Sequence, residues 1–480
     1  MPRARPPMNT PTLETLSTIR TDGSRKFVYP ADARGRFMFW RRVVAVLLMG
    51  IYIALPWIPV NGYPAVFLDV QGRRFHFLGL TLATQDLWVG FFLITGLAFS
   101  LFYLTALFGR IWCGWACPYT VFLEHVYRRI ERWVEGDAAE RRHRAEGPLT
   151  WGKAWRLAVK HSLYLLCSAL IAHLFLSYFV SLKTLYAMMH GSPAEHLSAF
   201  GIVVFLTGML YFSFAWFREQ FCIILCPYGR LQAALTDDHS MVVGYDARRG
   251  EPRGKVATVT GDCVDCRRCV QVCPTGIDIR NGLQLECIGC AACIDACDSV
   301  MTRLKRPTGL IRHDSQVGLQ GGRTRLWRPR IWFYTFLLAL GALAFGISAA
   351  QITPLKVAAS RMVGAPYYLG GGEVRNQFLV RIINKRNEPV SCRIGLDGPL
   401  PPALRAIGLE EILHLPALGE EQKAVILSVP DAAWTGGFRL RVKITDTRHG
   451  NSTLTGFLEF LGPDPRLKDD TPLHVQDFIQ

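Results

Sequence analysis

Charge is scarce in this sequence of 480 residues, and acidic charge is the scarcer sign. Charged residues make up 19% of the chain against 50% hydrophobic residues, and 38 Asp and Glu stand against 54 Lys and Arg. The apolar residues gather in long runs and the charges lie in the segments between them, which is typical of a chain that crosses a membrane. Because basic residues commonly flank membrane spans, the net charge of +16 does not indicate nucleic acid, and no nucleic-acid partner is expected.

The sequence also lacks two features of secreted proteins. Residues 1–42 are polar and Arg-rich, with no short apolar stretch ending in small residues, so no cleavable signal peptide is expected. The 14 cysteines form no disulfide framework, because eight of them fall within residues 263–297. Cys392 is the one cysteine of residues 353–480, so no disulfide is expected there. Cysteines at the density of 263–297 indicate a metal centre.

Five apolar runs approach the roughly 20 residues that a helix needs to cross a bilayer. They occupy residues 43–60, 87–109, 161–182, 197–217 and 331–352. The first follows a polar start and is expected to act as a signal anchor. The sequence therefore predicts an integral membrane protein of several domains, with a four-helix membrane domain over residues 43–217 and a fifth transmembrane helix after it.

Basic residues alternate between the segments that connect these runs. Lys and Arg number nine in residues 1–42, two in 61–86, nine in 110–156, one in 183–196 and seventeen in 218–330. Because basic connecting segments stay in the cytoplasm, we expect residues 1–42 and 218–330 to be cytoplasmic. The chain would then lie in a bacterial inner membrane, with residues 353–480 in the periplasm.

The C-terminal segment differs from the membrane segments in its pattern of apolar and polar residues. Residues 376–387, 422–430 and 438–460 alternate apolar and polar side chains, with turn residues between the stretches. An alternation with period two is typical of β-strands that have one buried face. Residues 353–480 are therefore predicted to form an immunoglobulin-like β-sandwich.

Residues 261–300 carry the strongest chemical pattern, the spacing C-x₂-C-x₂-C-x₃-C repeated twice. This run is typical of bacterial ferredoxins with two [4Fe–4S] clusters, in which the fourth cysteine of each run serves the other cluster. One cluster is therefore assigned to Cys263, Cys266, Cys269 and Cys297, and the other to Cys287, Cys290, Cys293 and Cys273. Zinc is the alternative for thiolate tetrads, but the doubled spacing favours a dicluster ferredoxin, an α+β domain over 256–305. Pro274 follows the first run as the pattern requires, whereas Asp298 replaces the second proline.

A second pair of cysteine motifs follows two of the apolar runs. Residues 112–119 read WCGWACPY and residues 221–228 read FCIILCPY. Proline favours the first turn of a helix, so each motif predicts a turn that leads out of a span into a surface helix. Residues 118–136 segregate apolar and basic residues as an interfacial helix does. Repetition at an offset of 109 residues implies two parallel helix-pair repeats, so the two cysteine pairs are expected to converge.

Several interpretations are open for Cys113, Cys117, Cys222 and Cys226. Together they could hold a further Fe–S cluster, or they could bind copper as Cu(I), which soft thiolates select. Each pair could instead cycle between dithiol and disulfide, or the four could simply pack a helix end. Cys167, alone in the third apolar run, is interpreted as core packing, and His161 and His173 as hydrogen-bonded groups within the membrane.

These features together resemble the cytochrome c oxidase accessory protein family, known as CcoG, FixG or RdxA. The resemblance rests on the Arg-rich start, CGWACPY, CPYGRLQ, the dicluster ferredoxin before the last span, and the β-sandwich. The polyferredoxin-type quinol dehydrogenases share the cysteine motifs. The β-sandwich and the lack of an amino-terminal flavin-binding domain favour the accessory family.

The resemblance implies a membrane-bound cupric reductase that converts Cu(II) to Cu(I) for assembly of a cbb-type cytochrome c oxidase. Its partners would be copper ions, oxidase subunits or copper-handling assembly factors, and an electron donor that the sequence does not name. Cys113, Cys117, Cys222 and Cys226 would be catalytic and metal-binding, and the eight ferredoxin cysteines would bind the clusters. Two alternatives are electron transfer from quinol to another acceptor, and an assembly scaffold with structural clusters.

Overall fold

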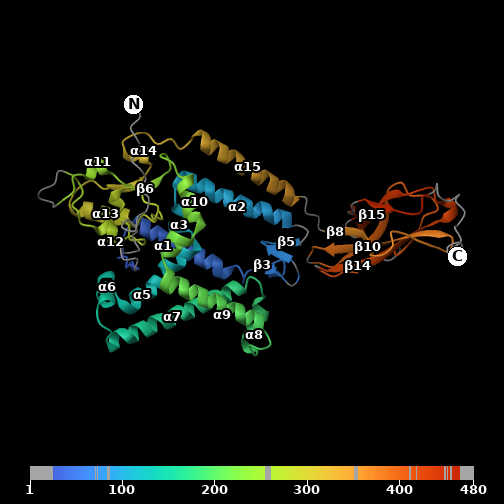
Figure 1. Cartoon of the computed structure of the whole chain (residues 1–480), viewed down its shortest axis with the longest axis horizontal. Helices are drawn as coiled ribbons and strands as arrows, with labels where there is room; N and C mark the ends of the chain where they lie inside the picture. Colours follow the sequence, from blue (N-terminus) through green and yellow to red (C-terminus); the bar gives the residue numbers. More distant parts are fainter. Residues whose placement is uncertain are drawn as a thin grey trace, which may run out of the picture. The chain divides into compact units, whose positions relative to one another are not determined.

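The computed structural model describes residues 25–464 except 71, 73, 84–86, 255–260, 351–354, 387, 410–411, 418, 448–449, 451 and 455–456. Parts of the predicted segments 1–42, 256–305, 331–352 and 353–480 therefore lie outside the described residues. The chain divides into two compact units, Met1–Ile347 and Ser348–Gln480, which are coloured blue to orange and orange to red in Figure 1.

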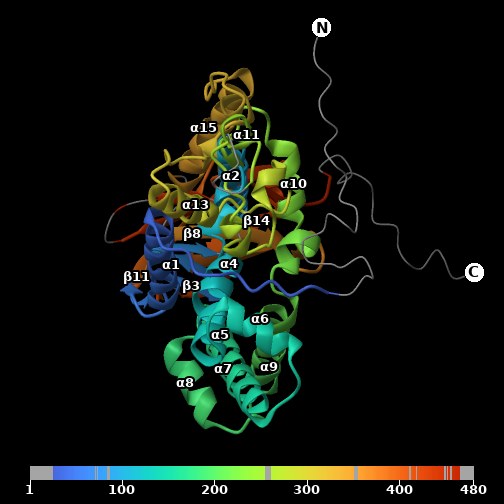
Figure 2. The ribbon, with the colours of Figure 1, turned by 90° about the vertical axis from the view of Figure 1, so that its left-hand side faces the viewer.

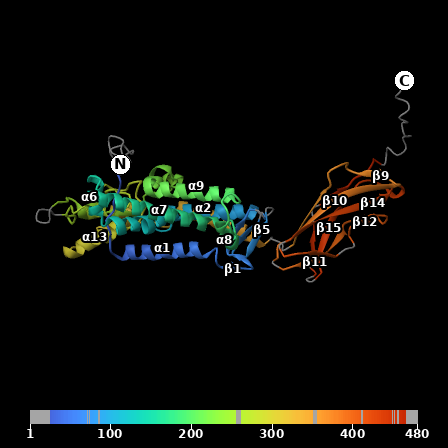
Figure 3. The same cartoon turned by 90° about the horizontal axis from the view of Figure 1, so that it is seen from below.

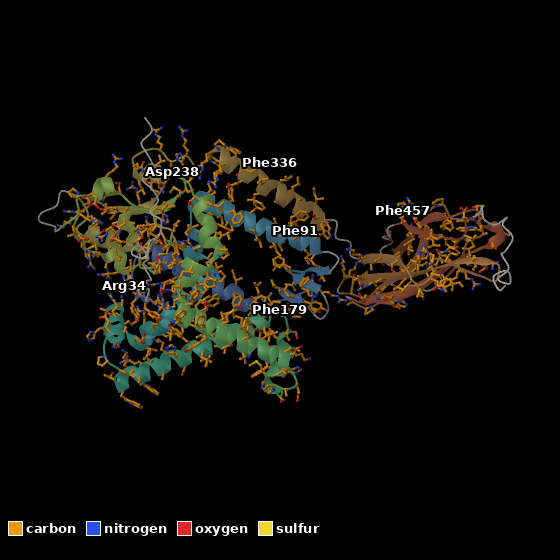
Figure 4. All side chains as sticks on the ribbon, viewed as in Figure 1. Arg34, Phe91, Phe179, Asp238, Phe336 and Phe457 are labelled. Atoms are coloured by element: carbon orange, nitrogen blue, oxygen red, sulfur yellow. The ribbon has the colours of Figure 1, made fainter. Side chains whose placement is uncertain are left out.

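Within the part of the chain that the structure describes, five helices are long and apolar enough to span a membrane. They are α1 (Arg36–Ala54), α2 (Leu87–Phe108), α7 (Trp151–Leu176), α9 (Leu197–Phe212), continued by a π-helical turn, η3 (Ser213–Phe217), and α15 (Pro329–Ala350). Large apolar side chains stand on their outer surfaces, among them Phe91 of α2 and Phe336 of α15 (Figure 4). Exposed apolar surface of this extent marks contact with lipid rather than water. The predicted multi-pass fold with five transmembrane helices is confirmed.

Helix α1 begins before its predicted apolar run, 43–60. The carboxylate of Asp295, which belongs to the ferredoxin, accepts hydrogen bonds from the backbone N–H groups of Phe37 and Met38 at 3.3 and 2.7 Å. The first N–H groups of a helix need such acceptors. Arg41, which resembles a flanking charge in the sequence, is buried and donates from Nε to the Gly114 carbonyl at 2.7 Å. Tertiary contacts therefore extend the helix beyond its apolar run.

The connecting segments lie at two opposite ends of the membrane helices (Figures 1 and 3). At one end lie α8 (Leu182–His190) and the short strands β1 (Pro59–Val60), β2 (Tyr63–Pro64), β3 (Val66–Asp69), β4 (Arg74–Phe77) and β5 (Leu80–Ala83). At the other end lie α5 (Arg128–Glu135), α6 (Ala138–Glu146) and the ferredoxin. Each span carries the chain from one end of the membrane helices to the other. The segments that connect successive spans therefore lie at alternate ends.

The third and fourth spans pack against each other. Helices α7 and α9 lie side by side (Figures 1 and 2), and Tyr211 of α9 contacts Nδ1 of His161 at 2.9 Å. Nδ1 of His173 lies 2.8 Å from the carbonyl of Ala169, one turn earlier in α7. Both membrane histidines are therefore hydrogen-bonded, as the sequence interpretation expects.

The cysteine-rich segment folds as an α+β domain. Strand β6 (Val242–Tyr245) pairs with β7 (Ile311–Asp314) in an antiparallel ladder, so the residues before and after the cysteines meet. Between them lie α11 (Ala247–Gly250), α12 (Arg268–Gln271), the 3₁₀ helix η5 (Ile279–Asn281) and α13 (Ala292–Arg303), with α14 (Gln316–Leu319) following β7. The apolar core between these elements includes several of the cysteines themselves.

The second unit is a β-sandwich of two sheets. One sheet has the order β12-β14-β10-β8 with β9 on β10, and the other has β13-β11-β15-β16 with β17 on β15. The strands are β8 (Leu355–Arg361), β9 (Tyr368–Gly370), β10 (Glu373–Asn384), β11 (Val390–Asp397), β12 (Arg405–Ile407), β13 (Ile412–Leu415), β14 (Glu420–Pro430), β15 (Phe438–Asp446), β16 (Ser452–Leu454) and β17 (Leu458–Phe460). Alternate residues of facing strands, such as Phe378, Leu427 and Ile444, fill the core between the sheets. The predicted immunoglobulin-like fold is confirmed.

Candidate metal centres

Each paired motif begins where a membrane helix is broken by a left-handed residue. Gly109 has a φ of 57° at the end of α2, and Arg218 has a φ of 50° at the end of η3. The two positions are equivalent in the repeat, because each lies four residues before the first cysteine of its motif. Glycine adopts this conformation freely, whereas arginine is held in it only by its surroundings. The break turns the chain into α3 (Ile111–Trp115) in one copy and the π-helical turn η4 (Phe221–Leu225) in the other.

The second cysteine of each motif is the N-cap of the next helix. Cys117 precedes α4 (Pro118–Phe122) and Cys226 precedes α10 (Pro227–Leu235), with the proline in the first turn. Both cysteines have extended ψ values, 123° and 112°, as the residue before a proline prefers. The predicted turn into a proline-started helix is confirmed in both copies.

The motif tyrosines cross between the two repeats. Tyr119 of the first motif donates to the carbonyl of Arg218, at the end of the fourth span, at 2.7 Å. Tyr228 of the second motif contacts the hydroxyl of Thr105, in the second span, at 2.5 Å. Each repeat thus fastens its motif to the membrane helix of the other repeat. This exchange brings the two motifs together at one end of the membrane helices.

The four thiols of Cys113, Cys117, Cys222 and Cys226, called the paired-motif thiols, converge as a result. The Cys222 thiol lies within electrostatic range of the other three thiols. Its burial is the main cause that raises the pKa of Cys222 to about 12, and the three neighbouring thiols raise it further. Burial likewise raises the pKa of Cys113, whose Sγ accepts from Nε2 of the fully buried Gln232 at 3.5 Å. The structure therefore gathers four soft donors from two segments of the chain.

The two ferredoxin runs have the same backbone geometry. Asp265 and Gly289, two residues after the first cysteine of each run, have φ values of 50° and 66°. Arg267 and Ala291, two residues further along, have φ values of 53° and 61°. Matching left-handed residues in both copies wrap each run into the same tight loop. The cysteine spacing that the sequence repeats twice thus forms the same loop twice in the structure.

The eight ferredoxin thiols lie in two sets. An inner set, Cys273, Cys287, Cys290 and Cys293, lines one cavity, which Cys269 also borders. An outer set, Cys263, Cys266, Cys269 and Cys297, shares electrostatic interactions, and Cys266 is exposed. Each set joins three thiols of one run with the fourth of the other. The spacing of the sequence predicts one cluster for each of these sets, and that assignment stays a prediction.

The inner cavity and its thiols fit an iron–sulfur cluster better than a single ion. Within the described chain, no three His, Cys, Asp or Glu side chains are grouped tightly enough to hold one metal ion, whereas a zinc site gathers its sulfurs at about 2.3 Å. Burial raises the pKa of Cys287 to about 12 and that of Cys290 to about 11. Such thiols stay protonated near neutral pH unless a metal displaces the proton. Backbone N–H groups of Gly289 and Ala292 are aimed at these two sulfurs and would stabilise thiolate.

Asp298 accounts for the missing second proline. Cys297 and Asp298 lie inside α13, whereas Cys273 and Pro274 lie beyond the end of α12. A proline within α13 would remove a backbone hydrogen bond of the helix. Asp298 lets the helix continue, and its carboxylate accepts from the backbone N–H of Gly309 at 2.8 Å.

The first paired motif lies directly on the inner ferredoxin loop. A Cβ added to Gly114 would lie 2.5 Å from the carbonyl oxygen of Ile288 and 2.9 Å from Cα of Cys290. Trp115 donates from Nε1 to the carbonyl of Gly289 at 3.3 Å, and Cys113 packs in the same apolar cluster as Cys290. Glycine is required here because only hydrogen fits between the two backbones. The inner set is therefore the ferredoxin neighbour of the paired-motif thiols.

A buried network of charges, which the sequence analysis missed, supports this junction. Its members are Arg25, Glu124, Arg128, Glu131, Arg141, Arg218 and Glu219. Glu131 accepts from Arg141 at 2.8 Å and Arg218 at 3.1 Å. Arg128 pairs with Glu219 at 3.0 Å and donates to the carbonyl of Pro274, next to the inner set.

This network corrects the interpretation of residues 118–136 as a helix lying in the interface. The segment is helical over α4, a π-helical turn, η2 (Leu123–Tyr127), and α5, but Glu124, Arg128 and Glu131 are buried rather than facing lipid headgroups. Arg128 and Glu131 pair with charges from other segments, and Glu124 pairs with Arg128 one turn further along, so burial is tolerated. Pairing over long sequence distances leaves no local pattern that could reveal it.

The fold and these thiols define a multi-pass membrane protein that carries iron–sulfur domains for electron transfer. Family models for a 4Fe–4S dicluster domain and a 4Fe–4S binding domain match residues 217–316 and 88–135, and the model for the immunoglobulin-like fold at the C-terminus of FixG matches 345–463. The second of these covers Cys113 and Cys117 of the first paired motif.

Three curated relatives match most of the chain. The nitrogen fixation protein FixG of Rhizobium meliloti (strain 1021) is 32% identical over 474 residues, 87% of this chain and 87% of that protein. Protein RdxA of Cereibacter sphaeroides is 36% identical over 77% of this chain and 82% of its own length, and RdxB of the same organism is 33% identical over 84% and 87%. The chain belongs to the FixG/RdxA family.

Proposed function

We propose that this protein is a membrane-bound cupric reductase, which converts Cu(II) to Cu(I) for assembly of a cbb-type cytochrome c oxidase. The observation that carries the proposal is the convergence of the four paired-motif thiols against the inner ferredoxin loop, at the Gly114–Cys290 contact. Four thiols beside a one-electron centre suit the reduction of an ion that thiolate then retains as Cu(I).

Two cysteine sets would hold the resident clusters. The inner set and the outer set would each bind one [4Fe–4S] cluster, which when bound supplies or accepts one electron at a time. Copper is the substrate, and Cys113, Cys117, Cys222 and Cys226 would receive it. Gln232 holds Cys113 by a hydrogen bond, and the crossed tyrosines hold the two motifs together. The chain therefore brings four thiol donors near one another.

The remaining parts of the proposal concern placement and partners. The basic segments put residues 1–42 and the ferredoxin in the cytoplasm and residues 353–480 in the periplasm of a bacterial inner membrane. The β-sandwich would then meet oxidase subunits or copper-handling assembly factors outside the membrane. Electrons would enter on the side of the membrane where the ferredoxin lies.

A second candidate follows from the 4Fe–4S binding model that covers the first motif. The paired-motif thiols would then hold a third cluster, and the protein would pass electrons to an acceptor other than copper. In both candidates electrons pass from the ferredoxin to the paired-motif thiols. The candidates differ in what the four thiols bind, which is copper in the first and a cluster in the second.

Metal analysis of a double cysteine variant separates the two candidates. In Cys222→Ser/Cys226→Ser, we expect unchanged iron and sulfide and lost copper binding. Cu(II) added to protein that has been reduced with dithionite and freed of the excess should be reduced at least about tenfold more slowly. Loss of about four iron atoms would instead indicate a third cluster. Cys167→Ser is the matched control, because Cys167 packs between the third and fourth spans, away from both cysteine groups. Wild-type rates of cupric reduction in the double variant would exclude the paired motifs as the copper site.

A further inference from the structure

An open cavity of about 530 Å³ lies between the paired motifs and the ferredoxin, and nothing described above uses it. One wall is the end of α2 and the start of α3, from Phe108 to Ile111. The other walls are α10, strands β6 and β7, and the ferredoxin loop 283–289. The cavity thus lies where the second membrane span meets the ferredoxin.

This cavity touches both groups of thiols. Cys287 of the inner set lines it on the ferredoxin side. Gln232, which donates to the sulfur of Cys113, lines it on the side of the paired motifs. A small redox-active molecule bound here would therefore be next to the inner set without entering the thiol site.

The lining favours an uncharged ring with oxygen substituents. None of the described lining residues is acidic, and Arg110 and His313 are the basic ones. The guanidinium of Arg110 donates to the carbonyl of Leu285, while its buried Nε has no hydrogen-bond partner within the described chain. Apolar side chains, among them Leu283, share the remaining surface with the polar side chains of Gln232, Thr236 and Gln284. Apolar walls with a few convergent donors are typical of a site for a small organic ligand.

The depth of the cavity indicates how such a ligand arrives. Phe108, the last residue of the α2 span, forms part of the wall, so the cavity lies at the level where the apolar surface ends. A carrier dissolved in the bilayer could reach this level with its ring while its tail stays in lipid. A hydrophilic carrier would have no need of a site at this depth.

We propose that this cavity binds the ring of a membrane quinol and is the entry point for electrons. Oxidation of the quinol breaks its two O–H bonds and releases two protons to water and two electrons, which leave one at a time to the iron–sulfur centres of the ferredoxin. Arg110 and His313 would bind the ring oxygens, and Leu283 would cover the ring at the mouth. The inference goes beyond the proposed function, because it names the donor and does not depend on copper as the acceptor.

The test narrows the cavity without changing a thiol or a charge. Leu283 is 48% exposed at the cavity, and Leu283→Trp should fill its mouth. Leu326→Trp is the matched control, since Leu326 is 43% exposed and does not line the cavity. Purified holoprotein in nanodiscs is exposed to a photoreactive azidoquinone, and the labelled peptides are identified by mass spectrometry. We expect labels within residues 108–111 and 283–289, lowered by about tenfold in Leu283→Trp and unchanged in Leu326→Trp.

A kinetic measurement gives an independent readout. Anaerobic mixing with a short-chain quinol should bleach the cluster absorbance of the wild type and of Leu326→Trp, and should do so about tenfold more slowly in Leu283→Trp. Reduction by dithionite should be equal in all three proteins, which shows that Leu283→Trp folds and keeps its clusters. Labelling or quinol oxidation that is equal in Leu283→Trp and wild type would overturn the proposal. Failure of the protein, once reduced with dithionite and freed of the excess, to reduce Cu(II) would overturn the proposed function alone.

Discussion

Replacing Gly114 by alanine is expected to slow the reduction of Cu(II) by protein that has been reduced with dithionite and freed of the excess reductant by about a hundredfold, while the iron content stays that of the wild type. The added methyl group would meet the carbonyl oxygen of Ile288 at 2.5 Å and backbone atoms of Cys290 at 2.9 Å. Backbone atoms cannot rotate away as a flexible side chain can, so the two loops must separate. The inner set would then move away from the paired-motif thiols, and each electron transfer between them would slow.

Two further variants separate the effect of the steric clash at Gly114 from other effects of a substitution. Gly90→Ala in α2 is the matched control, because a Cβ there meets nothing within 4 Å, and its rate should equal that of the wild type. Trp115→Phe removes the hydrogen bond to Gly289 at a cost of about 1 kcal/mol without a clash, and should give a smaller decrease. Wild-type rates in Gly114→Ala, with intact clusters by EPR, would show that electrons do not cross at this contact.

Replacing Glu131 by glutamine is expected to destabilise the ferredoxin side of the membrane unit by about 3–5 kcal/mol. The carboxylate is buried and is shared by Arg141 and Arg218, with Tyr164 donating to it at 2.8 Å. Glutamine keeps the shape but removes the charge, which leaves Arg141 without its carboxylate and Arg218 with Glu219 alone, at 3.7 Å. Thermal unfolding in detergent should show a large decrease in Tm, because Arg218 also holds the left-handed break before the second motif.

A surface pair supplies the control for this variant. Glu140 pairs with Arg144 on α6 at 3.3 Å and is largely exposed, so Glu140→Gln should change stability by at most about 1 kcal/mol. An equal Tm for Glu131→Gln and Glu140→Gln would show that the buried network does not stabilise the fold.

The same carboxylate predicts a loss of stability in acid. Burial alone would raise the pKa of Glu131, but the guanidinium groups of Arg218, Arg141 and Arg128 outweigh it and lower the pKa to about 2. A carboxyl whose folded pKa lies below its ordinary 4.5 stabilises the fold above pH 4.5 and loses that contribution as pH falls toward 2. The Tm of the wild type should therefore fall over this range more steeply than that of Glu131→Gln.

The ferredoxin could be predicted in detail because its chemistry is local. Cysteines at two-residue and three-residue intervals must form a tight loop, whatever the rest of the chain does. The left-handed positions at Asp265 and Gly289, equivalent in the two runs, show that the local pattern alone shapes each loop. The membrane spans could likewise be predicted from the length and apolar character of each run. Their ends could not, since α1 begins where Asp295 caps it from another domain.

The candidate thiol site was predictable only in part. Repetition of the C-x-x-x-C-P-Y frame indicates that two copies are related, and the structure brings the copies together. The crossed hydrogen bonds of Tyr119 and Tyr228 join residues about a hundred positions apart, and no local rule predicts them. The cavity lined by Arg110 and Leu283 depends on five segments, which are spread over residues 108–313.

The sequence by itself determined the parts of this protein: five membrane spans, two cysteine runs, two paired motifs and a β-sandwich. These follow from composition, period and spacing, which act between near neighbours in the chain. Only the tertiary structure decided that Gly114 lies against Cys290, and that seven buried charges close the junction around them. Such contacts depend on excluded volume and on the pairing of charges between distant segments, and both are settled only when the chain has folded.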